Sequence, residues 1–147
     1  MKIPDRFMVI DDDKTTTILC QHALRKFSNV TPLMTFMDPE LALNAIREEY
    51  GVKDAYIPTV MFLDINMPVM TGWDFLEAFK DFSIEVRKQF TIYILSSSID
   101  QRDETRSKLN PFVSGHISKP LKLESIKQIF NIVDNDSILS FRKIKTT

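Results

Sequence analysis

The stretch that decides the fold is Val60-Met61-Phe62-Leu63-Asp64-Ile65-Asn66-Met67-Pro68-Val69-Met70-Thr71-Gly72, an apolar run that ends in one acid and a short loop. Val60 to Leu63 is apolar at every position, which is typical of a strand buried on both faces of a parallel sheet. Asp64 then marks the end of that strand, and Pro68 with Gly72 predicts a turn into a helix. Because open α/β sheets bind ligands beyond the carboxyl ends of their strands, we interpret Asp64 as a residue placed for chemistry.

The composition of the 147 residues is that of one globular domain, with 44% hydrophobic and 27% charged residues. A net charge of −1 gives no sign of a nucleic-acid partner or an anionic membrane. Cys20 is the one cysteine, so no internal disulfide can form and a reducing compartment is expected. No apolar run reaches membrane-spanning length and no signal-peptide core begins the chain, so we predict a cytoplasmic protein without membrane contact.

Five apolar segments alternate with five helical patterns along the chain. The expected strands are Phe7–Ile10, Val30–Phe36, Val60–Asp64, Phe90–Leu95 and Val113–Ser118. The expected helices are Lys14–Phe27, Pro39–Glu49, Gly72–Phe82 with a polar continuation to Gln89, Ile99–Leu109, and a last one whose apolar stripe runs from Leu123 to Val133. This alternation predicts an α/β fold, a doubly wound parallel sheet of five strands with right-handed crossovers.

The same pattern predicts which parts are exposed and where the domain ends. Pro32 within the second segment places that strand at an edge of the sheet. Ile18 is expected to be exposed, because it lies opposite the apolar stripe of the first helix, formed by Leu19, Cys20, Ala23, Leu24 and Phe27. We expect one domain over residues 1–133 and a C-terminal tail over residues 134–147 that is too short for an output domain.

Polar residues follow four of the predicted strands. Asp11 and Asp12 follow the first strand, Asp64 the third, Ser96 the fourth and Lys119 the fifth. If the acids lie within a few ångströms, each like-charged pair costs about 4 kcal/mol at an effective dielectric near 20, which a cation or a raised pKa relieves. Oxygen ligands favour a hard ion, and Mg²⁺ also coordinates phosphate. Asp64 is the candidate nucleophile for an aspartyl phosphate, with Lys119 and Ser96 suited to the phosphoryl oxygens.

A purely structural interpretation explains single members of this set. Acids after a strand commonly cap the next helix, and Asp13 before Lys14 is accounted for by capping alone. A single acid or lysine would be structural more often than functional. Capping does not explain the whole set, in which each residue follows a strand, so we favour the functional interpretation.

Together these motifs resemble the response-regulator receiver domain of two-component signalling, over about Arg6 to Val133. The matching features are the acidic pair after the first strand, the pattern Asp64-x-x-Met67-Pro68-x-x-x-Gly72, the hydroxyl at the end of the fourth strand, and Lys119-Pro120. The resemblance implies a flavodoxin-like sheet with strand order 2-1-3-4-5. It also implies a signalling protein rather than an enzyme, in a stand-alone, single-domain form.

The resemblance implies a role for each residue at the metal and phosphate site. Asp64 would accept phosphate from a histidine kinase or a histidine phosphotransfer protein. Asp12 and Asp64 would bind Mg²⁺ directly, with the backbone carbonyl of Asn66 as a further ligand, and Asp11 would act indirectly. Ser96 would hydrogen-bond one phosphoryl oxygen and move toward it as part of the switch.

Lys119 would bind another phosphoryl oxygen, and the family usually has a cis bond before the next proline, here Lys119–Pro120. The aromatic switch position of the family is His116 here, which makes pH sensitivity conceivable. Ser97 stands where a small residue is common, and Asn66 and Ser98 occupy positions that tune the phosphate lifetime. The signal would leave through Ile99–Leu109, the last strand and the final helix toward a downstream protein that the sequence does not identify.

Two other classes of function remain open on the sequence. A haloacid-dehalogenase-type phosphatase would use Asp11 as nucleophile and Asp13 as acid/base, with Ser96 and Lys119 as its further motifs. That hypothesis leaves the loop from Asp64 to Gly72 unexplained. A binding module that keeps only the fold, or a flavin binder, is weaker, because the acidic set is intact and no Ser/Thr/Gly-rich phosphate loop follows the first strand.

Overall fold

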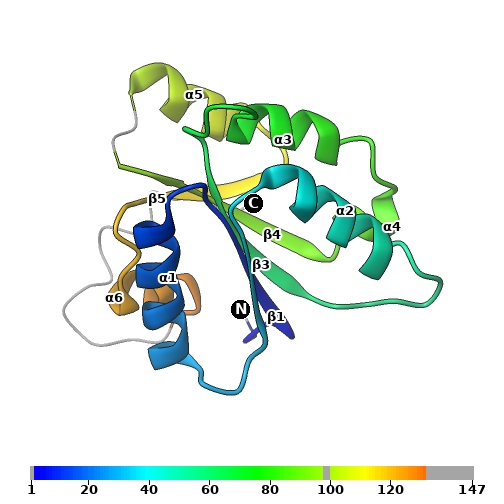
Figure 1. Cartoon of the computed structure of the whole chain (residues 1–147), viewed down its shortest axis with the longest axis horizontal. Helices are drawn as coiled ribbons and strands as arrows, with labels where there is room; N and C mark the ends of the chain where they lie inside the picture. The colour runs from blue at the N-terminus through cyan, green and yellow to red at the C-terminus, as the bar shows by residue number, and fades with distance from the viewer. Residues whose placement is uncertain (1, 98–99, 132–147) are drawn as a thin grey trace.

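The structure, a computed structural model, describes residues 2–97 and 100–131, which form a central parallel sheet covered by helices on both faces (Figure 1). The strands are β1 (Arg6–Ile10), β2 (Leu33–Phe36), β3 (Thr59–Asp64), β4 (Phe90–Ser96) and β5 (Val113–Ser118), in the order β2-β1-β3-β4-β5. All four strand pairs are parallel. The predicted doubly wound sheet and its strand order are therefore confirmed.

Strand β3 lies at the centre of the sheet, paired with β1 on one side and β4 on the other. Every one of its residues is buried, because the sheet pairs both of its edges and helices cover both of its faces. This burial explains the continuous apolar run that the sequence shows from Val60 to Leu63. The strand therefore delivers Asp64 to the middle of the sheet's carboxyl edge.

The helices divide between the two faces of the sheet (Figure 1). Helices α1 (Lys14–Phe27) and α6 (Leu123–Ile129) pack on one face, where Cys20, Leu24, Ile126 and Phe130 join one apolar core. Helices α2 (Pro39–Glu49), α3 (Gly72–Phe79) and α4 (Ile84–Arg87) pack on the other face and contribute to a second core. Helix α5 (Gln101–Leu109) follows β4 and packs beside β5.

The structure corrects several predicted details. Leu19 was predicted to lie in the apolar stripe but is 46% exposed, and Thr17 is buried on helix α1 instead. Ile18 is 52% exposed, as predicted. Helix α3 ends at Phe79, and the stretch toward Gln89 forms the separate helix α4. Strand β2 begins after Pro32, at the sheet edge as predicted. Ser98, the predicted helix start at Ile99, the predicted stripe end at Val133 and the predicted tail 134–147 lie outside the described residues.

No helix within residues 2–97 and 100–131 combines the length and apolar character that a membrane crossing would require.

Candidate functional site

The acids after β1 occupy three different environments. Asp11 is fully buried, and its Oδ1 accepts a hydrogen bond from the Asp13 backbone N–H at 2.9 Å. Asp12 is partly exposed at the rim. Asp13 is the N-cap of helix α1, and its carboxylate accepts from the backbone N–H groups of Thr15 at 2.8 Å and Thr16 at 3.2 Å. Two of the three acids are therefore available to the site, and the third holds the helix.

Asp64 is buried at the end of β3, and its position depends on the loop that follows. The Asn66 backbone N–H donates to Asp64 Oδ1 at 3.1 Å. Gly72 packs directly under this turn, because a Cβ atom on it would lie 2.6 Å from the Asp64 carbonyl oxygen. The glycine that the sequence motif contains is therefore required by close backbone contact rather than by its dihedral angles.

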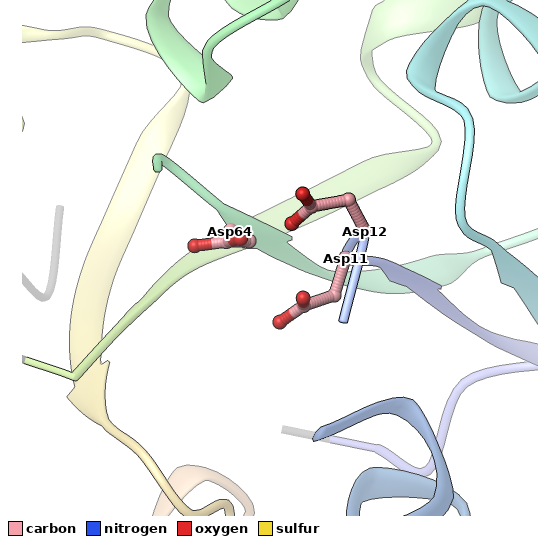
Figure 2. A group of neighbouring side chains, drawn as sticks. All are labelled: Asp11, Asp12 and Asp64. Atoms are coloured by element: carbon pink, nitrogen blue, oxygen red, sulfur yellow. The ribbon is translucent and has the colours of Figure 1, made fainter. Parts of the chain in front are cut away.

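Asp11, Asp12 and Asp64 gather where β1 and β3 end (Figure 2). Each offers one carboxylate oxygen to a group whose atoms all lie within 4.8 Å of one another. The proximity follows from the parallel pairing of β1 with β3, which aligns Ile10 with Leu63 and so brings the two strand ends together. The structure thus places the three acids as the sequence predicted.

Lys119 reaches this acidic group from the end of β5. Its Nζ lies 2.7 Å from Asp11 Oδ2 and 3.2 Å from Asp64 Oδ1. The peptide bond between Lys119 and Pro120 is cis, as the resemblance implied. Lys119 therefore forms ion pairs with two of the three acids.

These contacts shift the proton affinities of the site. Burial raises the pKa of the Asp11 carboxyl above its ordinary value of 3.8; Lys119 opposes this rise and the charge of Asp64 adds to it. Burial and the charge of Asp64 also raise the pKa of Asp12. Burial alone would lower the pKa of Lys119, but its close contacts with the Asp11 and Asp64 carboxylates raise it above 10.5. The site therefore has three carboxylates and one ammonium group, so it has an excess of negative charge when all three acids are ionised.

The donor set fits a hard divalent cation. All the available ligand atoms are carboxylate oxygens, and Asp11 Oδ2 is buried without a well-oriented hydrogen bond from the described residues, although the Lys119 ammonium lies beside it. Mg²⁺ prefers oxygen ligands around a small polar site, so this group of aspartates suits it. Asp11, Asp12 and Asp64 are the residues that could hold it.

Ser96 and Lys119 are brought together by the pairing of β4 with β5. Ser96 is buried at the end of β4 and lies opposite Ser118, and the Lys119 backbone N–H donates to the Ser96 carbonyl at 2.9 Å. The Ser96 side chain and the Lys119 ammonium thus emerge at the same edge as Asp64. Asn66 and Ser97 are exposed beside them, and His116 is half-buried on β5 opposite Ile94.

Thr17 is a site residue that the sequence reasoning missed. It is buried on helix α1, where its hydroxyl donates to the Asp13 carbonyl at 2.9 Å and lies 3.3 Å from the Asp11 carbonyl. These bonds tie the acidic loop to the first turn of the helix. The sequence signal was a threonine four residues after the capping Asp13, a spacing at which a hydroxyl can bond back to a carbonyl.

Comparison with known proteins identifies the family. A family model described as the response regulator receiver domain matches residues 7–131. A two component response regulator from Cytophaga hutchinsonii is 26% identical, with a TM-score of 0.78 and coverage of 89% of this chain and 97% of that chain. A search among curated proteins found no match.

Two further solved structures show the same fold. The response regulator receiver protein from Dyadobacter fermentans is 24% identical, with a TM-score of 0.76 and coverage of 86% of this chain and 95% of that chain. A response regulator receiver domain from Rhodospirillum rubrum is 25% identical, with a TM-score of 0.65 and coverage of 87% and 94%. The sheet and its helices are thus shared with receivers of differing sequence.

Proposed function

This chain belongs to the response regulator receiver family of two-component signalling, and on that premise we propose that Asp64 accepts a phosphoryl group from a phosphohistidine. Members of this family are signalling switches rather than enzymes. The observation that carries the proposal is the placement of Asp64. It is buried at the centre of the carboxyl edge, with Lys119 Nζ 3.2 Å from its Oδ1 and two further acids beside it.

In the proposed reaction the phosphoryl group passes from a histidine of the partner protein to Asp64. An Asp64 carboxylate oxygen forms a bond to phosphorus while the bond from phosphorus to the histidine nitrogen of the partner breaks. The electron pair of that bond returns to the imidazole, which then takes a proton from solvent. The donor is a histidine kinase or a histidine phosphotransfer protein, since the chain itself has His22 and His116 outside the acidic group.

Each neighbour of Asp64 has a proposed role in this reaction. Lys119 and the Ser96 hydroxyl bind phosphoryl oxygens and orient them. Asp12, Asp64 and the Asn66 backbone carbonyl hold Mg²⁺, with Asp11 acting indirectly. The ion, when bound, neutralises charge on the carboxylates and on the phosphoryl oxygens. A bound cation would offset the repulsion among the three acids, which adds to burial in raising the pKa values of Asp11 and Asp12.

The output of the switch is a protein surface. We infer that phosphorylation biases helix α5, strand β5 and helix α6 between two arrangements that a downstream protein distinguishes. His116 on β5 is the proposed switch residue of this face. We place the protein in the cytoplasm, with residues 1–133 as the receiver domain and neither nucleic acid nor a membrane as partner.

The test is phosphorylation by a small donor. Wild type, Asp64→Asn and the matched control Asp81→Asn, an exposed acid after helix α3, are incubated with acetyl phosphate and Mg²⁺ and then weighed intact by mass spectrometry. We expect one hydroxylamine-labile phosphate adduct on wild type and on Asp81→Asn, and none on Asp64→Asn. An equal adduct on Asp64→Asn would contradict the proposal, as would its absence from wild type with several donors.

A further inference from the structure

Helix α5 is attached to the domain differently from the other helices. All of its residues are described, and only Ser107 among them is buried, whereas Leu109 is 77% exposed. Helix α3, by contrast, buries Trp73, Phe75, Leu76 and Phe79 in the core. Apolar burial is the main force that holds helices in place, so helix α5 must be held largely by polar contacts.

Among the described residues, two polar side chains of helix α5 contact Trp73 on helix α3. The indole Nε1–H of Trp73 donates to Asp103 Oδ1 at 3.2 Å, and the guanidinium carbon of Arg106 lies 4.8 Å from the Trp73 ring centroid. Asp103 and Arg106 are three residues apart and therefore share one face of helix α5. We call Trp73, Asp103 and Arg106 the Trp73 cluster; it joins helix α3 to helix α5.

Trp73 is also close to the phosphoacceptor in the chain. Its neighbour Gly72 donates its N–H to the Ile65 carbonyl at 3.1 Å and packs against the Asp64 carbonyl so closely that no Cβ would fit. Because the two segments are in direct contact, a movement of the backbone at Asp64 and Ile65 also moves Gly72. Trp73 follows Gly72 directly in helix α3 and is 7% exposed, so neighbouring side chains surround its ring.

From these contacts we propose that the Trp73 cluster couples the state of Asp64 to the position of helix α5. The cluster holds helix α5 in its resting position, and phosphorylation of Asp64 loosens it. This inference rests on the proposed function of Asp64, but it assigns the coupling to a tryptophan on helix α3 that lies outside the proposed output face.

The direction of the effect follows from the geometry. Asp64 Oδ1 makes two contacts, with the Asn66 N–H at 3.1 Å and with Lys119 at 3.2 Å, and a phosphoryl group bonded to this oxygen displaces both. The loop that carries Ile65 must then rearrange, and Gly72 follows it. The Trp73 to Asp103 bond is already 3.2 Å long, at the upper end of the usual range, so a shift that lengthens it by a few tenths of an ångström weakens it.

The first experiment measures hydrogen exchange in residues 101–109 of the unmodified protein. Asp103→Ala is compared with Glu104→Ala, since both remove an acid from the first turn of helix α5 and only Asp103 contacts Trp73. We expect exchange about tenfold faster in Asp103→Ala, the factor for losing one hydrogen bond to a charged group, and little change in Glu104→Ala. Arg106→Ala against Arg102→Ala gives the same comparison for the cation. Equal exchange in each pair would overturn the proposal.

The second experiment adds acetyl phosphate and Mg²⁺ and follows exchange, intact mass and the emission of Trp73, the one tryptophan of the sequence. On phosphorylated wild type we expect faster exchange in residues 101–109 and a shifted emission, and on phosphorylated Asp103→Ala little further change in exchange. An adduct on wild type without faster exchange overturns the coupling. A wild type without adduct contradicts the proposed function instead, and the first experiment then decides whether the Trp73 cluster holds helix α5.

Discussion

The two ends of the sheet both bury polar groups, but only one of them buries charge. At the amino ends of β3 and β4, the uncharged side chains of Tyr50, Thr59 and Gln89 form a buried network, and the half-buried Arg6 donates to the Tyr50 hydroxyl at 3.3 Å. The Tyr50 and Thr59 hydroxyls lie 2.6 Å apart, and Thr59 Oγ1 donates to the Ile57 carbonyl at 2.7 Å. Gln89 accepts from the Ile57 N–H at 2.8 Å and donates to the Glu85 carbonyl at 2.9 Å.

At the carboxyl ends, three acids lie together and only Asp11 and Asp64 pair with Lys119; among the described residues, a buried oxygen of Asp11 also lacks a well-oriented hydrogen bond. A satisfied neutral network stabilises the fold and needs nothing further. A crowded charged group opposes folding and favours whatever brings positive charge. The comparison teaches that the polar residues of one end serve the structure and those of the other are arranged for a ligand.

The largest expected effect on stability is at the charged end, from Lys119→Met. Removing one partner of a buried ion pair leaves the other charge uncompensated, so we expect a loss of about 3 kcal/mol in the free energy of unfolding at pH 7. The loss should shrink as pH falls, because Asp11 then takes a proton. Urea unfolding without divalent ions measures both effects, with exposed Lys122→Met as the control.

Mg²⁺ sharpens this result. A ligand that binds only the folded state adds stability in proportion to the logarithm of its concentration. Adding Mg²⁺ should therefore restore part of the stability of Lys119→Met. Wild type should gain less, because its Lys119 competes with the ion for Asp11 and Asp64. A variant as stable as wild type, or one that ignores Mg²⁺, would mean that the charged end is not organised around a cation.

At the neutral end we expect a smaller loss that Mg²⁺ does not repair. Gln89→Leu leaves the Ile57 N–H and the Glu85 carbonyl without their side-chain partner, which costs roughly 2–3 kcal/mol in the free energy of unfolding. Exposed Gln101→Leu is the control, expected to change stability by less than about 0.5 kcal/mol. If Mg²⁺ stabilised Gln89→Leu more than wild type, the two ends would not be independent.

Much of the fold could be predicted because burial leaves a plain trace in the sequence. Strand β3 is apolar from Val60 to Leu63 because both of its faces are covered, and a polar residue marks the end of every strand except β2. The error at Leu19 has a physical cause. Helical spacing defines a stripe but not its edges, and Thr17 could take the buried place because the Asp11 and Asp13 carbonyls satisfy its hydroxyl.

The site was predictable only as far as backbone placement determines it. The parallel pairing of β1 with β3 brings Asp11 and Asp64 together once the strands are known. Whether Lys119 sits closer to one acid than to the other depends on side-chain geometry, and it lies closer to Asp11. The Trp73 to Asp103 bond joins residues 30 positions apart on two helices, and no local pattern announces it.

A third prediction concerns the pH dependence of the charged end. A raised acid pKa means that the folded protein holds the Asp11 proton more tightly than the unfolded chain does. The free energy of unfolding therefore falls as pH rises from the ordinary value of 3.8 through the higher value in the fold. Asp11→Asn removes this penalty, so it should be more stable than wild type at pH 7 by roughly 1–2 kcal/mol.

Urea unfolding between pH 4 and pH 8 without divalent ions checks this prediction. The advantage of Asp11→Asn should disappear toward low pH, where wild-type Asp11 is protonated. The raised pKa of Lys119 does not interfere, because its contribution is complete below 10.5 and is lost only above that value. A variant less stable than wild type across the whole range would show that the ion pair with Lys119 outweighs the burial of Asp11.

The smallest expected effect separates Asp13 from its two neighbours. Asp13 caps helix α1, so Asp13→Ala should cost about 1 kcal/mol in the free energy of unfolding, the usual value for a lost cap. Asp38→Ala is the matched control, since Asp38 caps helix α2 through the Glu40 N–H at 2.9 Å. The two variants should lose similar stability in urea unfolding.

Phosphorylation then separates the two chemical hypotheses for the acidic loop. Asp13→Ala should carry as much phosphate as Asp38→Ala after acetyl phosphate and Mg²⁺, measured by intact mass, because its carboxylate is occupied by the Thr15 and Thr16 N–H groups. A phosphatase that used Asp13 as acid/base would instead lose its chemistry in this variant alone. Loss of the adduct from Asp13→Ala but not from Asp38→Ala would move Asp13 into the site and extend the charged end beyond Asp11 and Asp12.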